Sequence, residues 1–357
     1  GCKNALKGIT MAKNILEVTD LAVEFETFGG TVQAVRGVSF EVEVGKTLAI
    51  VGESGCGKSV TVQSIMGIIP MPPGKITGGS AKLKGQEILG LPAAEANRYR
   101  GVEIGMIFQD PMTSLNPSMK IGHQIAETLM VHRGKSHADA MVTALQLLEK
   151  THIPEAAKRA LQYPFEFSGG MLQRAMIAQS LACNPSLLIA DEPTTALDVT
   201  IQAQILELLT ELQRTEGMSI LLITHDLAVV ARMADQVAVM YAGQIIERGS
   251  LDDIFYRSAH PYTLGLKSAM PSNSGAEEKN LQPIPGSPPD LFSPPLGCGY
   301  TARCPQAMQI CGNQLPQLIQ DPQDPRHLSR CWLQHKDAPN IEALYQPLKI
   351  MDTAGAD

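Results

Sequence analysis

The chain has 357 residues, of which 29 are basic and 36 acidic, and its formal net charge is −7 at neutral pH. That charge argues against a nucleic-acid partner, because binding by phosphate neutralisation needs a basic balance or a basic stripe. Hydrophobic residues make up 44% of the chain, yet no run of about 18 apolar residues occurs, which excludes both a disordered chain and a membrane-spanning helix. The length predicts two domains, or one large domain with an appendage.

The beginning of the chain shows neither the basic start nor the apolar core of a secretory signal. Residues 1–14, with a Met at position 11, are interpreted as an extension or an added tag. We expect a cytosolic chain whose thiols are reduced. The next stretches, 15–25 and 35–44, partly alternate apolar and polar residues, which indicates an antiparallel β subdomain.

Short apolar runs further along are too short for helices and indicate strands buried on both faces: 48–51, 104–108, 187–190 and 220–223. Segments of helical period separate them, and strands that alternate with helices predict parallel βαβ units in an α/β core. Candidate helices at 121–132 and 137–150 predict a helical subdomain over about 110–182. The α/β domain as a whole is predicted to span 15–270.

The run from Gly52 to Ser59, GESGCGKS, fits the phosphate-binding loop pattern and lies between a predicted strand and a predicted helix. In such a loop, backbone N–H groups wrap an anion at a helix N-terminus. Lys58 can then reach the β- and γ-phosphates, and the Ser59 hydroxyl can ligate Mg²⁺. By itself the loop predicts only a nucleoside triphosphate site.

A second motif is the pair of acids, Asp191 and Glu192, that ends the buried strand at 187–190. Two carboxylates at the end of an apolar strand are costly unless they meet a cation or a polar ligand. Phosphoryl transfer gives both a use, because one acid can hold Mg²⁺ while its neighbour orients or deprotonates the attacking water.

Further motifs occur in a fixed order around these two: Gln109 after a strand, FSGGMLQR at 167–174, ALD at 196–198 and His225 after the strand at 220–224. Together they cover about residues 15–250 and resemble the ATP-binding subunits of ABC transporters. The resemblance implies a P-loop ABC ATPase fold and a head-to-tail dimer. Each ATP then lies between the phosphate loop of one domain and the SGG signature of the other.

The resemblance also implies a role for each matching residue. Glu192 is the expected general base, His225 the expected γ-phosphate contact, and Gln109 the expected contact to metal and attacking water. Mg²⁺ is expected on Ser59, Gln109 and Asp191. Phe25 is expected to stack on the adenine ring, and Phe28 is the alternative residue for that role. The other expected ATP-binding residues are Gly52, Ser54, Gly55, Cys56, Gly57, Lys58, Ser59 and Val60. The partner's ATP is expected to meet Ser168, Gly169, Gly170 and Gln173.

Longer phrases narrow the resemblance to the ATPases of bacterial oligopeptide and dipeptide importers, a group that also handles nickel chelates and some other solutes: FQDPMTSLNP at 108–117, DEPTTALDVT at 191–200 and HPYT at 260–263. This implies a peripheral subunit at the cytoplasmic face of the inner membrane that hydrolyses ATP to drive peptide uptake. Its implied partners are a second ATPase subunit, two integral membrane permease subunits and an external binding protein. The stretch 109–116 is expected to line the groove for a coupling helix of the membrane subunit.

The composition changes after residue 270. Residues 271–297 contain seven prolines, which predicts a semi-rigid linker, followed by a four-cysteine module at 298–335 and a tail at 336–357. The module lacks the CxxC pairs of a zinc ribbon, and a reducing compartment disfavours disulfides. Four thiolates in a segment with little core suit a metal centre. The cysteines are Cys298, Cys304, Cys311 and Cys331.

The resemblance implies a 4Fe–4S cluster on these four cysteines. Zinc and unliganded cysteines stay open as alternatives. If the module senses redox state, an ATPase regulated by the cluster is the alternative function.

Overall fold

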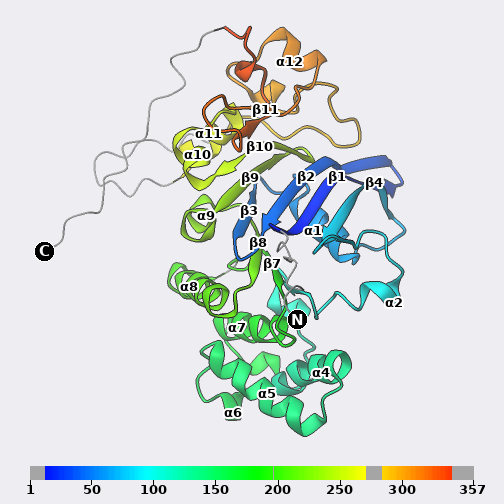
Figure 1. Ribbon diagram of the computed structural model, residues 1–357, viewed down its shortest axis with the longest axis vertical. Coiled ribbons are helices and arrows are strands. Elements are labelled where there is room, and N and C mark those ends of the chain that lie inside the picture. Colours follow the sequence, from blue (N-terminus) through cyan, green and yellow to red (C-terminus); the bar gives the residue numbers. More distant parts are fainter. Residues whose placement is uncertain (1–12, 196, 271–283, 340–357) are drawn as a thin grey trace, which may run out of the picture.

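The structure is a computed structural model that describes residues 13–195, 197–270 and 284–339. Two sheets occupy the middle of the molecule, helices α4 to α6 lie at one end, and the C-terminal described residues lie at the other (Figure 1). Most of the predicted N-terminal extension, the first half of the predicted linker and most of the tail lie outside the described residues. The described part contains no helix that is both long and apolar enough to cross a membrane.

The smaller sheet has four antiparallel strands in the order β2-β1-β4-β5. They are β1 (Asn14–Thr27), β2 (Gly30–Glu43), β4 (Gly74–Leu83) and β5 (Gln86–Glu87). In β1 the apolar side chains of Leu16, Val18, Leu21 and Val23 are buried, while several of the residues between them are exposed. This alternation places one face of the sheet on the core, as the sequence pattern predicts.

The larger sheet has eight strands in the order β11-β12-β10-β9-β3-β8-β7-β6. Its parallel part consists of β6 (Ile104–Ile107), β7 (Leu187–Asp191), β8 (Ser219–Thr224), β3 (Thr47–Val51) and β9 (Gln236–Tyr241). All residues of β3, β6, β7 and β8 are buried, which explains their continuous apolar runs. Because neighbouring strands are parallel, their carboxyl ends meet at one edge of the sheet.

The helices that follow these strands are α1 (Lys58–Met66), α8 (Val199–Glu216) and α9 (Leu227–Met233). Helices α4 (Ile121–Arg133), α5 (His137–Lys150), α6 (Ala156–Arg159) and α7 (Gly169–Ser180) share a separate apolar cluster, which includes Leu129, Ala144, Leu148 and Leu172. The short helix α3 (Pro111–Ser114) precedes them and has no buried residue. The bounds of α5 match the expected helix, because the Ser136 hydroxyl caps it by accepting from the Asp139 N–H at 3.2 Å. The short helix α2 (Ala93–Ala96) precedes β6.

The C-terminal part is built onto the edge of the larger sheet. Strand β10 (Gln244–Ser250) pairs with β12 (Leu328–Ser329), which pairs with β11 (Ile319–Gln320), both antiparallel. Helices α10 (Leu251–Tyr256) and α11 (Pro261–Ser268) precede the cysteine-bearing residues, and α12 (Gln309–Asn313) lies among them. The cysteine-bearing region, residues 298–335, therefore contributes two strands to the sheet of the α/β core.

Candidate functional site

The phosphate loop connects β3 to α1, and its glycines are required by close backbone contacts. A Cβ on Gly52 would lie 2.1 Å from the Met240 carbonyl oxygen, and one on Gly57, whose φ is 103°, would lie 2.4 Å from the Ala34 oxygen. Lys58 is 5% exposed, and its Nζ donates to the carbonyl oxygens of Gly52 at 2.8 Å and Glu53 at 3.0 Å. The loop thus places a buried cation beside the N–H groups that begin α1, which forms an anion site.

Ser59 and Asp191 meet at the ends of α1 and β7. The Ser59 hydroxyl donates to Asp191 Oδ1 at 2.9 Å, and burial raises the pKa of the Asp191 carboxyl although this hydrogen bond opposes the shift. In the described residues no group of three or more His, Cys, Asp or Glu side chains could hold a metal ion. One carboxylate and one hydroxyl suit Mg²⁺, which proteins often bind through few side chains together with substrate phosphates.

Glu192 is the centre of the predicted catalytic set. Its Oε2 accepts from Gln109 Nε2 at 3.2 Å and from the Thr195 hydroxyl at 2.8 Å, and its Oε1 lies 3.2 Å from His225 Nδ1. The φ of Glu192 is 48°, a left-handed conformation that costs energy for a residue with a side chain and that clusters at functional sites. The structure therefore brings Gln109, Glu192 and His225 together from the ends of β6, β7 and β8.

The SGG motif begins α7. The Ser168 hydroxyl accepts from the Met171 N–H at 3.4 Å, and both Ser168 and Gly169 are exposed. Gly170 packs on α8, because a Cβ there would lie 2.8 Å from Ile201 Cγ2. Gln173, by contrast, is 2% exposed and does not face solvent. Its predicted contact with a partner's ATP stays a prediction that this burial does not support.

The two candidate aromatic residues for adenine differ in environment. Phe25 in β1 is half-buried against the core, whereas Phe28, just after β1, is fully exposed. The choice between them stays a prediction. Cys56 in the phosphate loop is buried, and burial raises the pKa of its thiol, which makes it a poor nucleophile.

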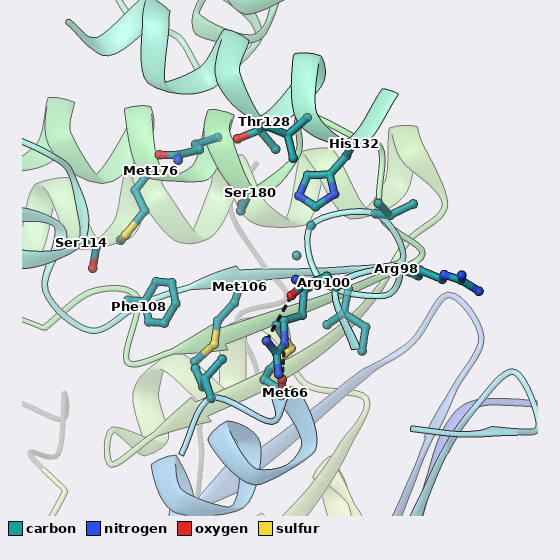
Figure 2. Close-up of a pocket in the computed structure, with 18 of the residues that line it drawn as sticks. Met66, Arg98, Arg100, Met106, Phe108, Ser114, Thr128, His132, Met176 and Ser180 are labelled. Atoms are coloured by element: carbon teal, nitrogen blue, oxygen red, sulfur yellow. Dashed lines mark hydrogen bonds between the residues drawn. The ribbon is translucent and has the colours of Figure 1, made fainter. Parts of the chain in front are cut away.

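A cleft of about 850 Å³ separates the α/β core from the helices α4 and α7. Figure 2 shows His132 and Met176 on the helical side, with Met106, Phe108 and Arg100 on the core side. Its lining is mainly apolar, with the basic side chains Arg98 and Arg100 and the histidine at one end. Ser114 of α3, from the stretch predicted to form a coupling groove, also lines this cleft.

The four C-terminal cysteines line one small cavity, together with the buried His260. All four are free thiols, and burial raises the pKa of Cys304 to about 11 and that of Cys331 to about 12. No three of them are arranged as metal ligands in the described structure. The predicted iron–sulfur cluster on Cys298, Cys304, Cys311 and Cys331 is therefore not supported by the geometry of these thiols.

Three residues near the phosphate loop and Glu192 escaped the sequence reasoning. Thr195 lies within the DEPTT phrase and was detectable there, since it sits three residues after Glu192. Tyr262, in the HPYT phrase, accepts a hydrogen bond from the Glu53 N–H at 2.9 Å. Arg303 pairs with Glu53 across 250 residues and carried no local signal.

Comparisons with known proteins agree with these features. Family models match residues 35–195 as an ABC transporter and residues 246–311 as an oligopeptide/dipeptide transporter C-terminal region. The oligopeptide transport ATP-binding protein OppD of Bacillus subtilis is 55% identical over 92% of this chain and 91% of its own length. The dipeptide transport ATP-binding protein DppD of the same organism is 53% identical over 91% and 96%. The ATP-binding cassette MJ0796, solved as a dimer bound to ADP and Pi, superimposes with a TM-score of 0.60 at 26% identity over 66% of this chain and 98% of its own.

Proposed function

The chain belongs to the family of oligopeptide and dipeptide ABC transporter ATP-binding proteins, and from this premise we propose that it energises peptide uptake across a bacterial inner membrane. It is an ATPase whose hydrolysis is coupled to transport. The observation that carries the proposal is the meeting of Gln109, Thr195 and His225 on Glu192, beside Ser59 and Asp191. These groups lie at one edge of a parallel sheet, where the phosphate loop also ends.

Each residue has a role that follows from its position. The loop N–H groups and Lys58 bind the β- and γ-phosphates, and Ser59, Gln109 and Asp191 hold Mg²⁺, which neutralises phosphate charge when bound. Glu192, oriented by its hydrogen bonds, accepts the proton of the attacking water, and His225 lies beside it to contact the γ-phosphate. The exposed Ser168 and Gly169 are free to complete the ATP site of a paired ATPase subunit, which supports a head-to-tail dimer with that subunit.

The cleft between the core and α4 supports the docking of a helix from a membrane permease subunit. Its apolar lining suits the apolar face of a helix, and its basic end suits an acidic side chain on that helix. Docking there would hold the chain at the cytoplasmic face of the membrane. The loop from Gln109 to α3 borders both the cleft and Glu192, so movement of a docked helix could change the position of Gln109.

Two valines test this docking. Val131 lines the cleft and is 71% exposed, whereas Val142 on α5 is 56% exposed and is not part of the lining. We expect Val131→Glu to prevent co-purification with the membrane subunits and Val142→Glu to leave it unchanged, with nucleotide binding intact in both. Equal assembly of the two variants would contradict docking at this cleft.

The function itself is tested by reconstitution. The chain, its paired ATPase subunit and the two permease subunits are assembled in proteoliposomes with the external binding protein. We expect peptide to stimulate ATP hydrolysis and to accumulate inside, and Glu192→Gln to abolish both. If a nickel chelate stimulates hydrolysis and no peptide does, the transported substrate is a nickel chelate and not a peptide.

An iron–sulfur centre in the C-terminal part is a finer proposal, which rests on the resemblance and on the presence of four free thiols along one cavity, although no three of these thiols are arranged as metal ligands in the described residues. No catalytic role is assigned to it. Anaerobic purification followed by visible absorbance and by iron and acid-labile sulfide analysis tests it. Protein without iron and sulfide contradicts the proposal, and ATPase activity that changes with the oxidation state of the centre favours the redox-sensing alternative.

A further inference from the structure

Arg303 connects the cysteine-bearing region to the phosphate loop. It is the last residue of the 3-10 turn Thr301–Arg303 and is 9% exposed. Its guanidinium forms a bidentate ion pair with Glu53, the residue after the first glycine of the phosphate loop. The Nη1 and Nη2 groups donate to the two carboxylate oxygens at 2.7 and 3.0 Å. Such a planar pair fixes orientation as well as charge.

The remaining donors of Arg303 are also used. Nη1 donates to the Tyr241 hydroxyl at 3.1 Å, Nε to the Pro285 carbonyl oxygen at 2.8 Å, and Nη2 to that of Ile284 at 3.2 Å. The guanidinium also lies 5.8 Å from the centre of the Tyr241 ring. A cation held from several directions is a fixed anchor for the loop rather than a mobile surface charge.

Glu53 is held at three points. Arg303 holds its carboxylate, the Tyr262 hydroxyl accepts from its N–H, and its carbonyl oxygen accepts from Lys58 Nζ. This carboxylate lies in the loop that binds phosphate, so without a partner its negative charge would repel a triphosphate. Pairing with Arg303 removes most of that repulsion.

We propose that Arg303 is a positioning residue for the phosphate loop, which it holds in shape and shields from the charge of Glu53. The cysteine-bearing region thereby contributes to nucleotide affinity although it contains no residue of the predicted catalytic set. Cys304, the next residue along the chain, lines the cavity that the four C-terminal cysteines share. A disordered cysteine-bearing region would therefore displace Arg303 and leave the phosphate loop without this ion pair.

The test is binding of Mg²⁺ and adenylyl imidodiphosphate, a slowly hydrolysed ATP analogue, to the purified full chain by titration calorimetry. We expect Arg303→Gln to raise the Kd about tenfold, because it leaves a part-buried carboxylate unpaired beside an anion. Arg303→Lys, which keeps the charge but not the planar pair, should lie between wild type and Arg303→Gln. The loss should be largest at low salt.

Two further variants separate this role from general stability. Arg330 anchors the same region to the carbonyl oxygens of Ile245 and Pro316 without touching the phosphate loop, so Arg330→Gln should lower the melting temperature but leave the Kd unchanged. Adding Glu53→Gln to Arg303→Gln removes the unpaired charge and should bring the Kd back to within about threefold of wild type. Equal Kd values for Arg303→Gln and Arg330→Gln, or no recovery in the double variant, would overturn the proposal.

Discussion

Helices α1 and α7 both begin at glycine-containing loops whose N–H groups can bind an anion, but their surroundings differ. The start of α1 is enclosed by the chain itself, with Lys58 buried and Ser59 bonded to Asp191. The start of α7 is exposed, and its Ser168 contacts only its own helix among the hydrogen bonds of the described residues. The first site has its own cation and carboxylates. If the second completes the ATP site of a paired subunit, as proposed above, this difference explains why one chain carries both.

The largest effect is expected from a substitution that removes hydrolysis but keeps ATP binding at the site where α1 begins. Glu192→Gln keeps the side-chain shape but removes the proton acceptor, so we expect turnover to fall by about 10²–10⁴-fold. The affinity for ATP should stay close to wild type. Steady-state ATPase rates and equilibrium binding check this, and hydrolysis at the wild-type rate would remove Glu192 from the role of general base.

A second substitution tests which helix start binds nucleotide in the isolated chain. Lys58→Met removes a buried cation that makes charge-assisted hydrogen bonds, and we expect it to raise the Kd for ATP roughly 10–100-fold. Ser168→Ala, its counterpart at α7, should leave the Kd unchanged and lower turnover only in the assembled dimer. A comparable loss of binding in both variants would mean that the two sites are not distinct.

A third comparison concerns packing behind the exposed helix start. Gly170→Ala forces a shift against Ile201, which we expect to cost about 1–3 kcal/mol. Gly169→Ala is the matched control, because its Cβ would meet Leu197 at an ordinary 3.7 Å. Thermal unfolding of the isolated variants should show a clearly lower melting temperature only for Gly170→Ala, and equal losses would contradict this packing argument.

The smallest expected effect concerns Asp191. Burial raises its pKa above the ordinary value of 3.8, so its contribution to stability is present below that pH and is lost as the pH rises through the raised value. In buffer without Mg²⁺ or nucleotide, Asp191→Asn should therefore raise the melting temperature of the chain at pH 7 and have little effect below pH 3.8.

Thermal melts across this pH range measure the stabilisation, and Mg²⁺ with ATP should raise the melting temperature of wild type more than that of Asp191→Asn. A variant no more stable than wild type at pH 7 would show that the buried carboxylate carries no cost.

Much of the fold followed from local patterns. The buried strands β3, β7 and β8 follow from continuous apolar runs of four residues, which are too short for helices. The helix expected at 137–150 has the bounds of α5, and the cap at Ser136 that starts it was seen only in the structure. The meeting of Gln109, Glu192 and His225 was also predictable, since each residue follows a strand of one parallel sheet and such strands end at a common edge.

The sequence by itself determined the phosphate loop, the order of the motifs and the membership of the family, because these depend on residue types at fixed short spacings. Only the tertiary structure decided that Gln173 is buried, that β12 extends the core sheet, and that Arg303 reaches Glu53. These contacts join residues that are distant in sequence, or depend on which side of a helix packs inward. Local propensity contains no information about either, because both are set by how the finished elements pack against one another.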